Sequence, residues 1–313
     1  MKALIVSLLL LSTAAFADSS IREYQGQVFS LENQAQCEQE FSRISNVINS
    51  IEGAMVIDGG CQMYGDRFVQ INMKYEAPIT TYIDRFRHQF KSSEVCEAQA
   101  ALSSTIFSQS KNLFIASFCQ GRTYRFDYID NTYSVMRNLG LNAQFKTEAQ
   151  CMGELKKIEK VVADYGMTTL ISNCREFETI RRDGKYYRPE FFYLSVYSKK
   201  LNVIRGREVQ NNCLSQRTTI ERDFADADIR LSHQFCSGYE SVREFLVYLD
   251  ESASVIPAIK EYKGTTYADA QTCEQKRGDI IAVFTQTKKM TVYSYCEKRG
   301  ESRHTPMVYY ARK

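Results

Sequence analysis

Ten cysteines occur along this chain as five pairs of nearly constant spacing. The two members of a pair are 23 residues apart in four cases and 24 in one, and successive pairs begin 55 to 62 residues apart: Cys37/Cys61, Cys96/Cys119, Cys151/Cys174, Cys213/Cys236 and Cys273/Cys296. Self-similarity at a fixed period indicates one small supersecondary unit copied in tandem. The cysteines therefore predict five repeats, at 18–76, 77–131, 132–198, 199–250 and 251–313.

The first 17 residues have the features of a secretory signal peptide. Lys2 precedes the apolar run Ala3 to Leu11, and Ala15-Phe16-Ala17 is a small-x-small cleavage site. The apolar run is too short to span a bilayer. We expect an exported chain, periplasmic or secreted, that begins near Asp18 and is not stably inserted in a membrane. An even number of cysteines in that compartment predicts a disulfide framework.

A helix is predicted around the first cysteine of each repeat. Apolar residues follow that cysteine after seven positions in four repeats and after eleven in all five: Ile44, Ile158, Ile220, Ile280; Ile48, Phe107, Val162, Phe224, Phe284. With offset 4, which is apolar in three repeats, these offsets describe one helix face, so the cysteine should be buried. Residues that favour the N-cap position stand four residues before the cysteine in four repeats: Asn33, Ser92, Thr147, Asp269. The fourth repeat has Val209 there, so its helix entry is predicted to be the weakest.

Strands are predicted on both sides of each helix. The second cysteine lies in a stretch rich in β-branched and aromatic residues, which a polar turn and another aromatic stretch follow. An upstream strand ends shortly before the helix. The 20 tyrosines and 18 phenylalanines of the chain fit this strand content. Each repeat therefore reads β-α-β-β, and the fold class is α+β.

The spacing favours a disulfide within each repeat. A helix of about 15 residues rises about 22 Å, and a returning strand of six or seven residues descends about 20–23 Å, so the second cysteine arrives beside the first. The rival scheme joins Cys61 to Cys96, Cys119 to Cys151 and so on along the chain, across the less regular gaps of 35, 32, 39 and 37 residues. A bridge within a repeat closes a loop that contributes about 3 kcal/mol of stability. That contribution matters for a repeat too small to have a large core.

Two assemblies of the repeats remain open from the sequence. No flexible linker separates them, so they can pack as an open stack or close into a ring that leaves no bare strand edge. Five modules of three strands and one helix resemble the five-fold α/β propeller of the pentein superfamily. The resemblance rests on element count over the mature chain and on no shared motif. Pentein enzymes use a catalytic cysteine, whereas every cysteine here has a partner, so their chemistry is not implied.

No motif for catalysis, metal or cofactor binding stands out. The histidines His88, His233 and His304 occupy different places in three repeats, so we expect no metal site and no cofactor. A formal charge of +3 without a basic segment argues against nucleic-acid binding. A pair of carboxylates at a repeat junction is the arrangement that would still permit acid–base catalysis.

One set of arginines suggests a binding site. They stand six or seven residues after the second cysteine of each repeat: Arg67, Arg125, Arg181, Arg243 and Arg303. In the third repeat a longer hairpin makes Arg188 the alternative equivalent. In a closed ring these guanidinium groups could converge on an anion, which arginine binds bidentately. The other interpretation is that each pairs with a nearby acid, as Asp66/Arg67 and Arg243/Glu244 suggest.

These observations favour an exported, non-catalytic binding or scaffold protein whose partner is a protein or glycan of the cell envelope. The repeats share framework residues and little else, whereas a single active site should leave one repeat conspicuously different. Two alternatives remain: a hydrolase or lyase that acts on envelope glycans or peptides through carboxylates at a repeat junction, and an inhibitor of an envelope-active enzyme. The oligomeric state is not predicted.

Overall fold

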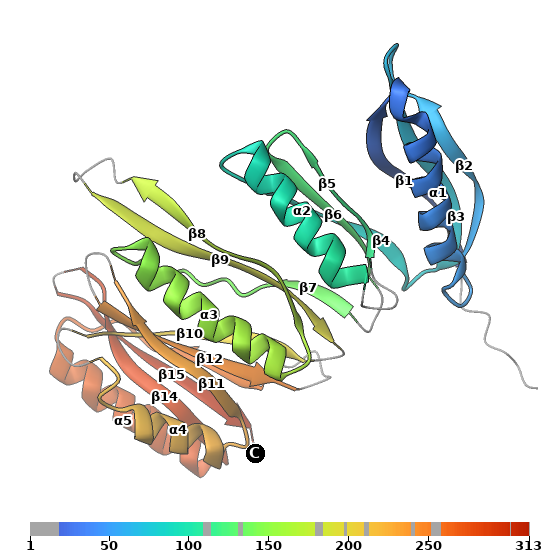
Figure 1. Ribbon diagram of the computed structural model, residues 1–313. Helices are drawn as coiled ribbons and strands as arrows, with labels where there is room; N and C mark the ends of the chain where they lie inside the picture. Colours follow the sequence, from blue (N-terminus) through green and yellow to red (C-terminus); the bar gives the residue numbers. More distant parts are fainter. Residues whose placement is uncertain are drawn as a thin grey trace, which may run out of the picture. The chain divides into compact units, whose positions relative to one another are not determined.

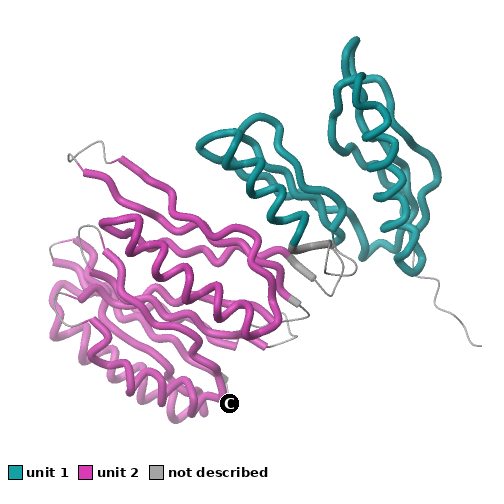
Figure 2. The backbone as a smooth tube through the Cα atoms, in the orientation of Figure 1, with its two compact units in different colours: residues 1–132 teal, residues 133–313 magenta. Residues whose placement is uncertain are grey.

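Figure 1 shows the chain as a computed structural model, which describes residues 19–108, 114–130, 134–178, 184–196, 199–209, 213–238, 242–251, 258–300 and 302–312. Two compact units, 1–132 and 133–313, divide it (Figure 2), and each is considered by itself. The predicted signal peptide and Arg181 lie outside the described residues. None of the helices within the described ranges combines the length and apolar character needed to cross a bilayer.

The first unit contains two β-α-β-β repeats. A short 3-10 helix, η1 (Leu31–Asn33), precedes the first α-helix. The elements are β1 (Ser19–Ser30), α1 (Gln34–Asn49), β2 (Met55–Met63) and β3 (Phe68–Pro78), followed by β4 (Tyr82–Gln89), α2 (Ser93–Ser108), β5 (Phe114–Gln120) and β6 (Thr123–Asp130).

The second unit contains three further repeats of the same order. The elements are β7 (Ser134–Asn138), α3 (Glu148–Asp164), β8 (Thr168–Glu178) and β9 (Lys185–Val196); β10 (Lys200–Val209), α4 (Arg217–Asp226), β11 (Arg230–Ser237) and β12 (Val242–Asp250); and β13 (Ile259–Lys263), α5 (Ala270–Gln286), β14 (Lys289–Lys298) and β15 (His304–Arg312). The mixed α/β repeat predicted from the cysteine spacing is therefore present.

Each repeat forms its own antiparallel sheet, in which the last strand lies in the middle. The strand orders are β1-β3-β2, β4-β6-β5, β7-β9-β8, β10-β12-β11 and β13-β15-β14. Among the described residues these sheets stay separate, each with two edge strands, and they are not closed into a ring. The ring alternative is therefore wrong. Consecutive repeats inside a unit contact each other partly through the packing of a helix against the next sheet: α1 on β5, α3 on β11 and α4 on β14.

The helices are amphipathic in the predicted register. In α1 the side chains of Cys37, Ile44 and Ile48 are at most 1% exposed, and in α3 the equivalent Cys151, Ile158 and Val162 are completely buried. These side chains face the sheet of their own repeat, because 0, 7 and 11 positions return to the same side of a helix.

The predicted N-caps are only partly used. The Thr147 hydroxyl accepts a hydrogen bond from the backbone N–H of Gln150, and the Asp269 carboxylate accepts one from Thr272 at 2.7 Å. Asn33 makes no side-chain cap, because η1 already leads the chain into α1. The fourth repeat, which lacks a capping residue at Val209, has the shortest α-helix, and that helix begins only after Cys213. Its weak entry is thus a feature of the fold.

All five disulfides join cysteines of the same repeat, so the within-repeat prediction is confirmed and the rival scheme is wrong. The bridges are Cys37–Cys61, Cys96–Cys119, Cys151–Cys174, Cys213–Cys236 and Cys273–Cys296. The Cα atoms are 6.0–6.2 Å apart in every bridge, and no cysteine is free. The rival partner of Cys119, which is Cys151, belongs instead to the bridge of the third repeat.

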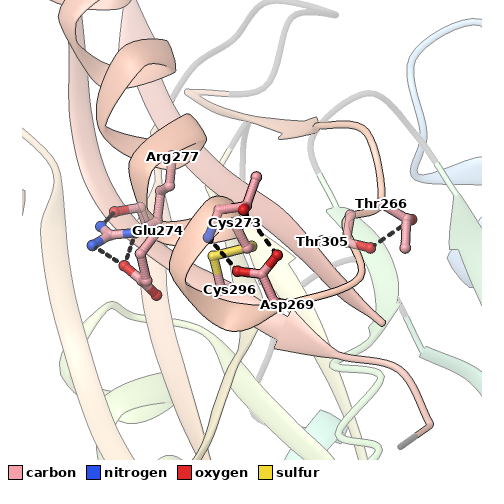
Figure 3. The surroundings of a disulfide bond; sticks show 9 residues. Thr266, Asp269, Cys273, Glu274, Arg277, Cys296 and Thr305 are labelled. Carbon is pink, nitrogen blue, oxygen red and sulfur yellow. Dashed lines mark hydrogen bonds and ion pairs between the residues drawn. A yellow bond between two sulfur atoms is a disulfide. The ribbon is translucent and has the colours of Figure 1, made fainter. Parts of the chain in front are cut away.

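In the second repeat the two cysteines of the bridge differ in burial. Cys96 lies in the first turn of α2 and is completely buried, whereas Cys119 lies near the end of β5 and is half-buried. Figure 3 shows the bridge of the last repeat, Cys273–Cys296, which links α5 to β14. Beside it Arg277 forms an ion pair with Glu274. The hydroxyls of Thr266 and Thr305 are hydrogen-bonded in the same view. Each bridge fastens the helical side of a repeat to the strand that returns beneath it.

Candidate anion-binding site

A glycine marks an irregularity in the first strand of several repeats. The pairing of β1 with β3 shifts after Gln25, and that of β10 with β12 shifts after Arg205; Gly26 and Gly206 follow those positions. A Cβ at Gly206 would lie 2.7 Å from the Tyr293 hydroxyl, and one at Gly26 would lie 2.9 Å from the Tyr24 ring. Glycine is therefore required where the first strand bulges against its neighbours.

In the first and fourth repeats a side chain of the middle strand donates a hydrogen bond to the carbonyl of this glycine, and it does so from the same position of the strand. The Gln70 amide donates to the Gly26 carbonyl at 3.2 Å, and Arg243 Nη1 donates to the Gly206 carbonyl at 3.0 Å. Both donors lie opposite the residue that follows the second cysteine, since Gln62 pairs with Gln70 and Ser237 with Arg243. Gln70 and Arg243 are therefore structural equivalents.

The same ladder position in the third repeat is Arg188, which lies opposite Arg175, the residue after Cys174. Arg188 is thus the structural equivalent of Arg243 in the preceding repeat, as the longer hairpin suggested. The strand pairing also makes Arg205 the structural equivalent of Gln25. Arg205 lies opposite Phe245 in the fourth repeat, and Gln25 lies opposite Asn72 in the first.

A cavity of about 220 Å³ lies where the third and fourth repeats meet. Asn142, Gln144 and Arg188 of the third repeat line it, together with Arg205, Ser237 and Arg243 of the fourth. The nearly buried ring of Phe245 also borders it. Among the residues that the structure describes, none that lines this cavity is acidic.

The lining carries hydrogen-bond donors that the described residues leave unused. The Ser237 side chain is 3% exposed, and its hydroxyl has no hydrogen-bond partner within those residues. Arg188 stacks its guanidinium on Phe177 and Tyr186, at 4.9 and 5.9 Å from the ring centres. Its Nε is buried without an acceptor in the described part of the chain. Buried polar atoms without partners are rare, and each is a reason to look for a missing ligand or water.

The two arginines of the fourth repeat differ in their surroundings. Arg243 is mostly buried, with Glu208 at 3.5 Å and Glu297 at 4.0 Å. Arg205 is exposed, and no ion pair of its guanidinium occurs within the described ranges. Three guanidinium groups therefore border one small space, and the described carboxylates compensate little of their charge, which is the chemistry of an anion site.

The arginines selected from the sequence do not occupy one place. Arg243, with its third-repeat equivalent Arg188, borders the cavity. Arg67 and Arg303 are exposed in the turns before β3 and β15. A role for these arginines in binding remains a prediction.

Arg125 of the second repeat occupies a different ladder position. Cys119 lies opposite Tyr124, so Arg125 lies opposite Phe118, the residue before the cysteine rather than the one after it. The Arg125 side chain is 6% exposed, and its guanidinium is placed over the Phe118 ring at 4.9 Å. The shared distance from the second cysteine therefore does not make Arg125 an equivalent of Arg243.

Arg205 was missed by sequence reasoning, although a signal for it exists. In three of the repeats a polar or charged residue directly precedes a glycine near the end of the first strand, as Gln25-Gly26, Arg205-Gly206 and Lys263-Gly264. These glycines stand 11, 7 and 9 residues before the first cysteine. An alignment anchored on the cysteines at fixed offsets cannot align them, because the segment between bulge and helix varies in length.

Two carboxylates are completely buried at repeat junctions. Asp127 accepts hydrogen bonds from Arg85 Nε at 2.8 Å and from the Tyr24 hydroxyl at 2.9 Å. Glu244 accepts them from the Gln234 amide at 2.6 Å and from the Tyr293 hydroxyl at 2.7 Å. Burial and the adjacent carboxylate raise the pKa of Tyr24 and of Tyr293, so both hydroxyls remain donors. These carboxylates join neighbouring repeats and are covered by protein.

The three histidines lie in different repeats. His233 Nε2 is 2.8 Å from Glu154, a contact that links α3 to β11, whereas His88 and His304 belong to β4 and β15. Within the part of the chain that the structure describes, no three His, Cys, Asp or Glu side chains are grouped as a metal would require.

Comparison of the chain with protein-family models, with curated proteins and with solved structures finds no match.

Proposed function

We propose that this chain is an exported, non-catalytic binding protein that holds an anionic group in the cavity between its third and fourth repeats. The observation that carries the proposal is the lining itself, with Arg188, Arg205 and Arg243 around one space to which the described residues contribute no carboxylate. Arginine stays charged in proteins and matches carboxylate and phosphate with its planar fork of donors.

The covalent framework supports export and binding rather than catalysis. All ten cysteines are engaged in disulfides, so no thiol is free to act as a nucleophile. Disulfides persist in the periplasm and outside the cell, where the predicted signal peptide would deliver the chain. The carboxylates at the junctions, Asp127 and Glu244, are taken up by neighbouring side chains and are poorly placed to reach a substrate. The ligand would be an acidic group on a protein or glycan of the cell envelope.

Calorimetric titration of the mature chain at low ionic strength with sulfate, phenyl phosphate and glucuronate tests this function. We expect at least one of these anions to bind, with an affinity that falls as salt screens the charges. The double variant Arg205→Gln/Arg243→Gln should lose at least about tenfold in affinity, since each hydrogen bond to a charged group contributes about 1.5–3 kcal/mol.

The double variant Arg67→Gln/Arg303→Gln is the matched control, because it removes the same charge from two exposed positions that are not part of the lining of the cavity. No binding of any probe, or an equal loss in this control, would refute the proposed function.

A further inference from the structure

We infer that the cavity between the third and fourth repeats accepts a dianionic tetrahedral group, the terminal phosphate of a monoester or its sulfate counterpart, in preference to a carboxylate. This inference rests on the proposed function and assigns a ligand class to the same cavity. Four observations carry it: the number of donors, the charge, the size of the space and the contrast with the first repeat.

The donors come from several elements rather than from one. Arg188 lies on β9, Arg205 on β10, Ser237 on β11 and Arg243 on β12, while the amides of Asn142 and Gln144 belong to the segment before α3. A carboxylate has two oxygens and is satisfied by one guanidinium fork. A phosphate monoester presents three strongly accepting oxygens that point in different directions. Donors that converge from several elements therefore suit a phosphate monoester better than a carboxylate.

The charge of the lining also fits a dianion. Three guanidinium charges border the cavity, and the nearest carboxylate of a neighbouring residue is that of Glu208, 3.5 Å from Arg243. Glu297 lies farther, at 4.0 Å, and is held at 2.6 Å by Arg299. Within the described part of the chain, about two positive charges are therefore left without a counter-ion, and a carboxylate would neutralise one of them. A phosphate monoester carries about −1.5 to −2 at pH 7.

The size of the cavity restricts the ligand to a small charged group and the first atoms of whatever carries it. A volume of about 220 Å³ is below the range of roughly 300–1,000 Å³ that is usual for sites enclosing a whole drug-sized molecule. Phe245 borders the space with a ring that is 2% exposed, so water is excluded on that side. Exclusion of water strengthens the hydrogen bonds that remain.

The first repeat shows that the fold does not need arginine at these positions. There Gln25 stands in place of Arg205 and Gln70 in place of Arg243, and the Gln70 amide makes the same bond to the bulge carbonyl. A hollow of about 230 Å³ borders Gln25, and its charged lining residues are Glu23, Asp58 and Lys74, so its described carboxylates outnumber its described cation. A neutral amide is therefore sufficient to hold the bulge. The arginines of the fourth repeat add charge that the backbone does not require.

The discriminating experiment is a calorimetric titration of the mature chain with phenyl phosphate, inorganic phosphate, sulfate, glucuronate and acetate, at pH 8 and pH 5. We expect phenyl phosphate and sulfate to bind at least about tenfold more tightly than either carboxylate at pH 8. The affinity for phenyl phosphate should fall about tenfold at pH 5, because the second pKa of a phosphate monoester is about 6. Sulfate, which does not titrate in this range, should bind equally at both pH values.

Substitutions locate the site. Arg205→Gln alone and Arg205→Gln/Arg243→Gln copy the residues of the first repeat, so the fold should tolerate them, and unfolding curves verify this. Both should weaken phenyl phosphate and sulfate binding, by about tenfold per arginine, while Arg67→Gln/Arg303→Gln should not. Glu208→Gln removes the carboxylate that competes for Arg243 and should tighten binding severalfold.

Different results would refute the ligand class and the anion-binding function. If glucuronate binds more tightly than phenyl phosphate and the Arg205 and Arg243 variants lose that binding, the ligand class is wrong and the anion-binding function stands. If no anion binds, or if the variants bind as well as the parent chain, both are wrong. Tighter binding of phenyl phosphate than of inorganic phosphate would identify an esterified group as the ligand, and the reverse order would identify the free ion; either order supports a phosphate site.

Discussion

The first and fourth repeats have the same topology but use the two faces of their sheets differently. Along β3 buried and exposed residues alternate, so that Val69, Ile71 and Met73 face α1 while Lys74 is exposed. Along β12 seven consecutive residues are buried, because both faces of the strand are covered. Phe245, Val247 and Leu249 pack with α3 on one face. Leu246 and Tyr248 pack with α4 on the other. The burial pattern of the middle strand therefore tells whether one helix or two pack on its sheet.

The same difference extends to the hollow beside the bulge. In the first repeat this hollow lies on the exposed side of the sheet, and amides, two carboxylates and the ammonium group of Lys74 line it. In the fourth repeat the corresponding face meets the third repeat, and the hollow becomes a cavity lined by arginines. A repeat face that is exposed to water is polar for solubility, whereas a face covered by a neighbouring repeat must be apolar unless its polar groups have partners. Unpaired donors at a covered face therefore indicate a binding site.

The largest expected effect comes from one position of the middle strand, where the residue of each of these two repeats is replaced by the residue type of the other. Lys74 and Val247 are equivalent, three positions beyond the residue opposite the second cysteine. Val247→Lys should cost about 3–5 kcal/mol of the free energy of unfolding, as an uncompensated buried charge does. Lys74→Val should change it by no more than about 0.5 kcal/mol, because the Lys74 side chain is 57% exposed. Urea unfolding at pH 7 measures both.

A milder substitution at the same position keeps the prediction testable if Val247→Lys does not fold. Val247→Thr keeps the volume and buries one hydroxyl, which should cost about 1–3 kcal/mol. Equal effects of Val247→Thr and Lys74→Val would contradict the packing of α3 on β12.

An intermediate effect is expected at the two tyrosine–carboxylate junctions. Tyr293→Phe leaves Glu244 with Gln234 and with Arg207 at 3.9 Å, whereas Tyr24→Phe leaves Asp127 with two hydrogen bonds from Arg85. We expect Tyr293→Phe to lower the free energy of unfolding by about 1–3 kcal/mol and Tyr24→Phe to lower it by less. Urea unfolding of both variants at pH 7 ranks the two junctions, and the opposite ranking would contradict this account.

The buried hydroxyls of Tyr24 and Tyr293 also predict that the stability of the folded chain depends on pH in the alkaline range. The pKa of each hydroxyl is raised in the folded chain by burial and by the neighbouring carboxylate. Folding therefore opposes ionisation, and the stability of the parent chain should decline as pH rises above about 10, the pKa of an unfolded tyrosine. Each phenylalanine variant should show a shallower decline over that range. A decline as steep as that of the parent would show that other tyrosines dominate.

Sequence periodicity was sufficient for the repeat and its disulfides, because both depend on local geometry. A helix from Cys37 and a returning strand to Cys61 bring the two sulfurs together whatever surrounds them, and the same holds for Cys96 and Cys119. The assembly depends on surfaces instead, and counting elements could not distinguish a ring from separate sheets. The alternation along β3 and the continuous apolar run in β12 contain that information, since they report how many faces are covered.

The candidate site was harder to predict than the fold. Arg243 was found because its distance from Cys236 resembles that of other arginines from their cysteines. Arg125 stands at a similar distance from Cys119, yet it lies opposite Phe118 rather than opposite the residue after the cysteine. Hairpins of different length change the ladder position that a fixed offset reaches. Arg205 precedes a bulge, whose distance from the helix varies among repeats. Pairing registers, which only the structure provides, were needed to align these arginines.

The smallest expected effect is a gain of binding in the first repeat. Gln25→Arg/Gln70→Arg places the two arginines of the fourth repeat beside an equivalent bulge, and the longer donor at position 70 can still reach the Gly26 carbonyl. Glu23, Asp58 and Lys74 line that hollow and give it one net negative charge, so half of the added charge is neutralised locally and sulfate should bind no more than severalfold better than to the parent hollow. Adding Glu23→Gln and Asp58→Asn should raise the affinity further. Calorimetric titration in the Arg205→Gln/Arg243→Gln background isolates the new site. Strong binding by the first double variant alone would show that two arginines at the bulge are sufficient, and that the facing third repeat contributes little to the natural cavity.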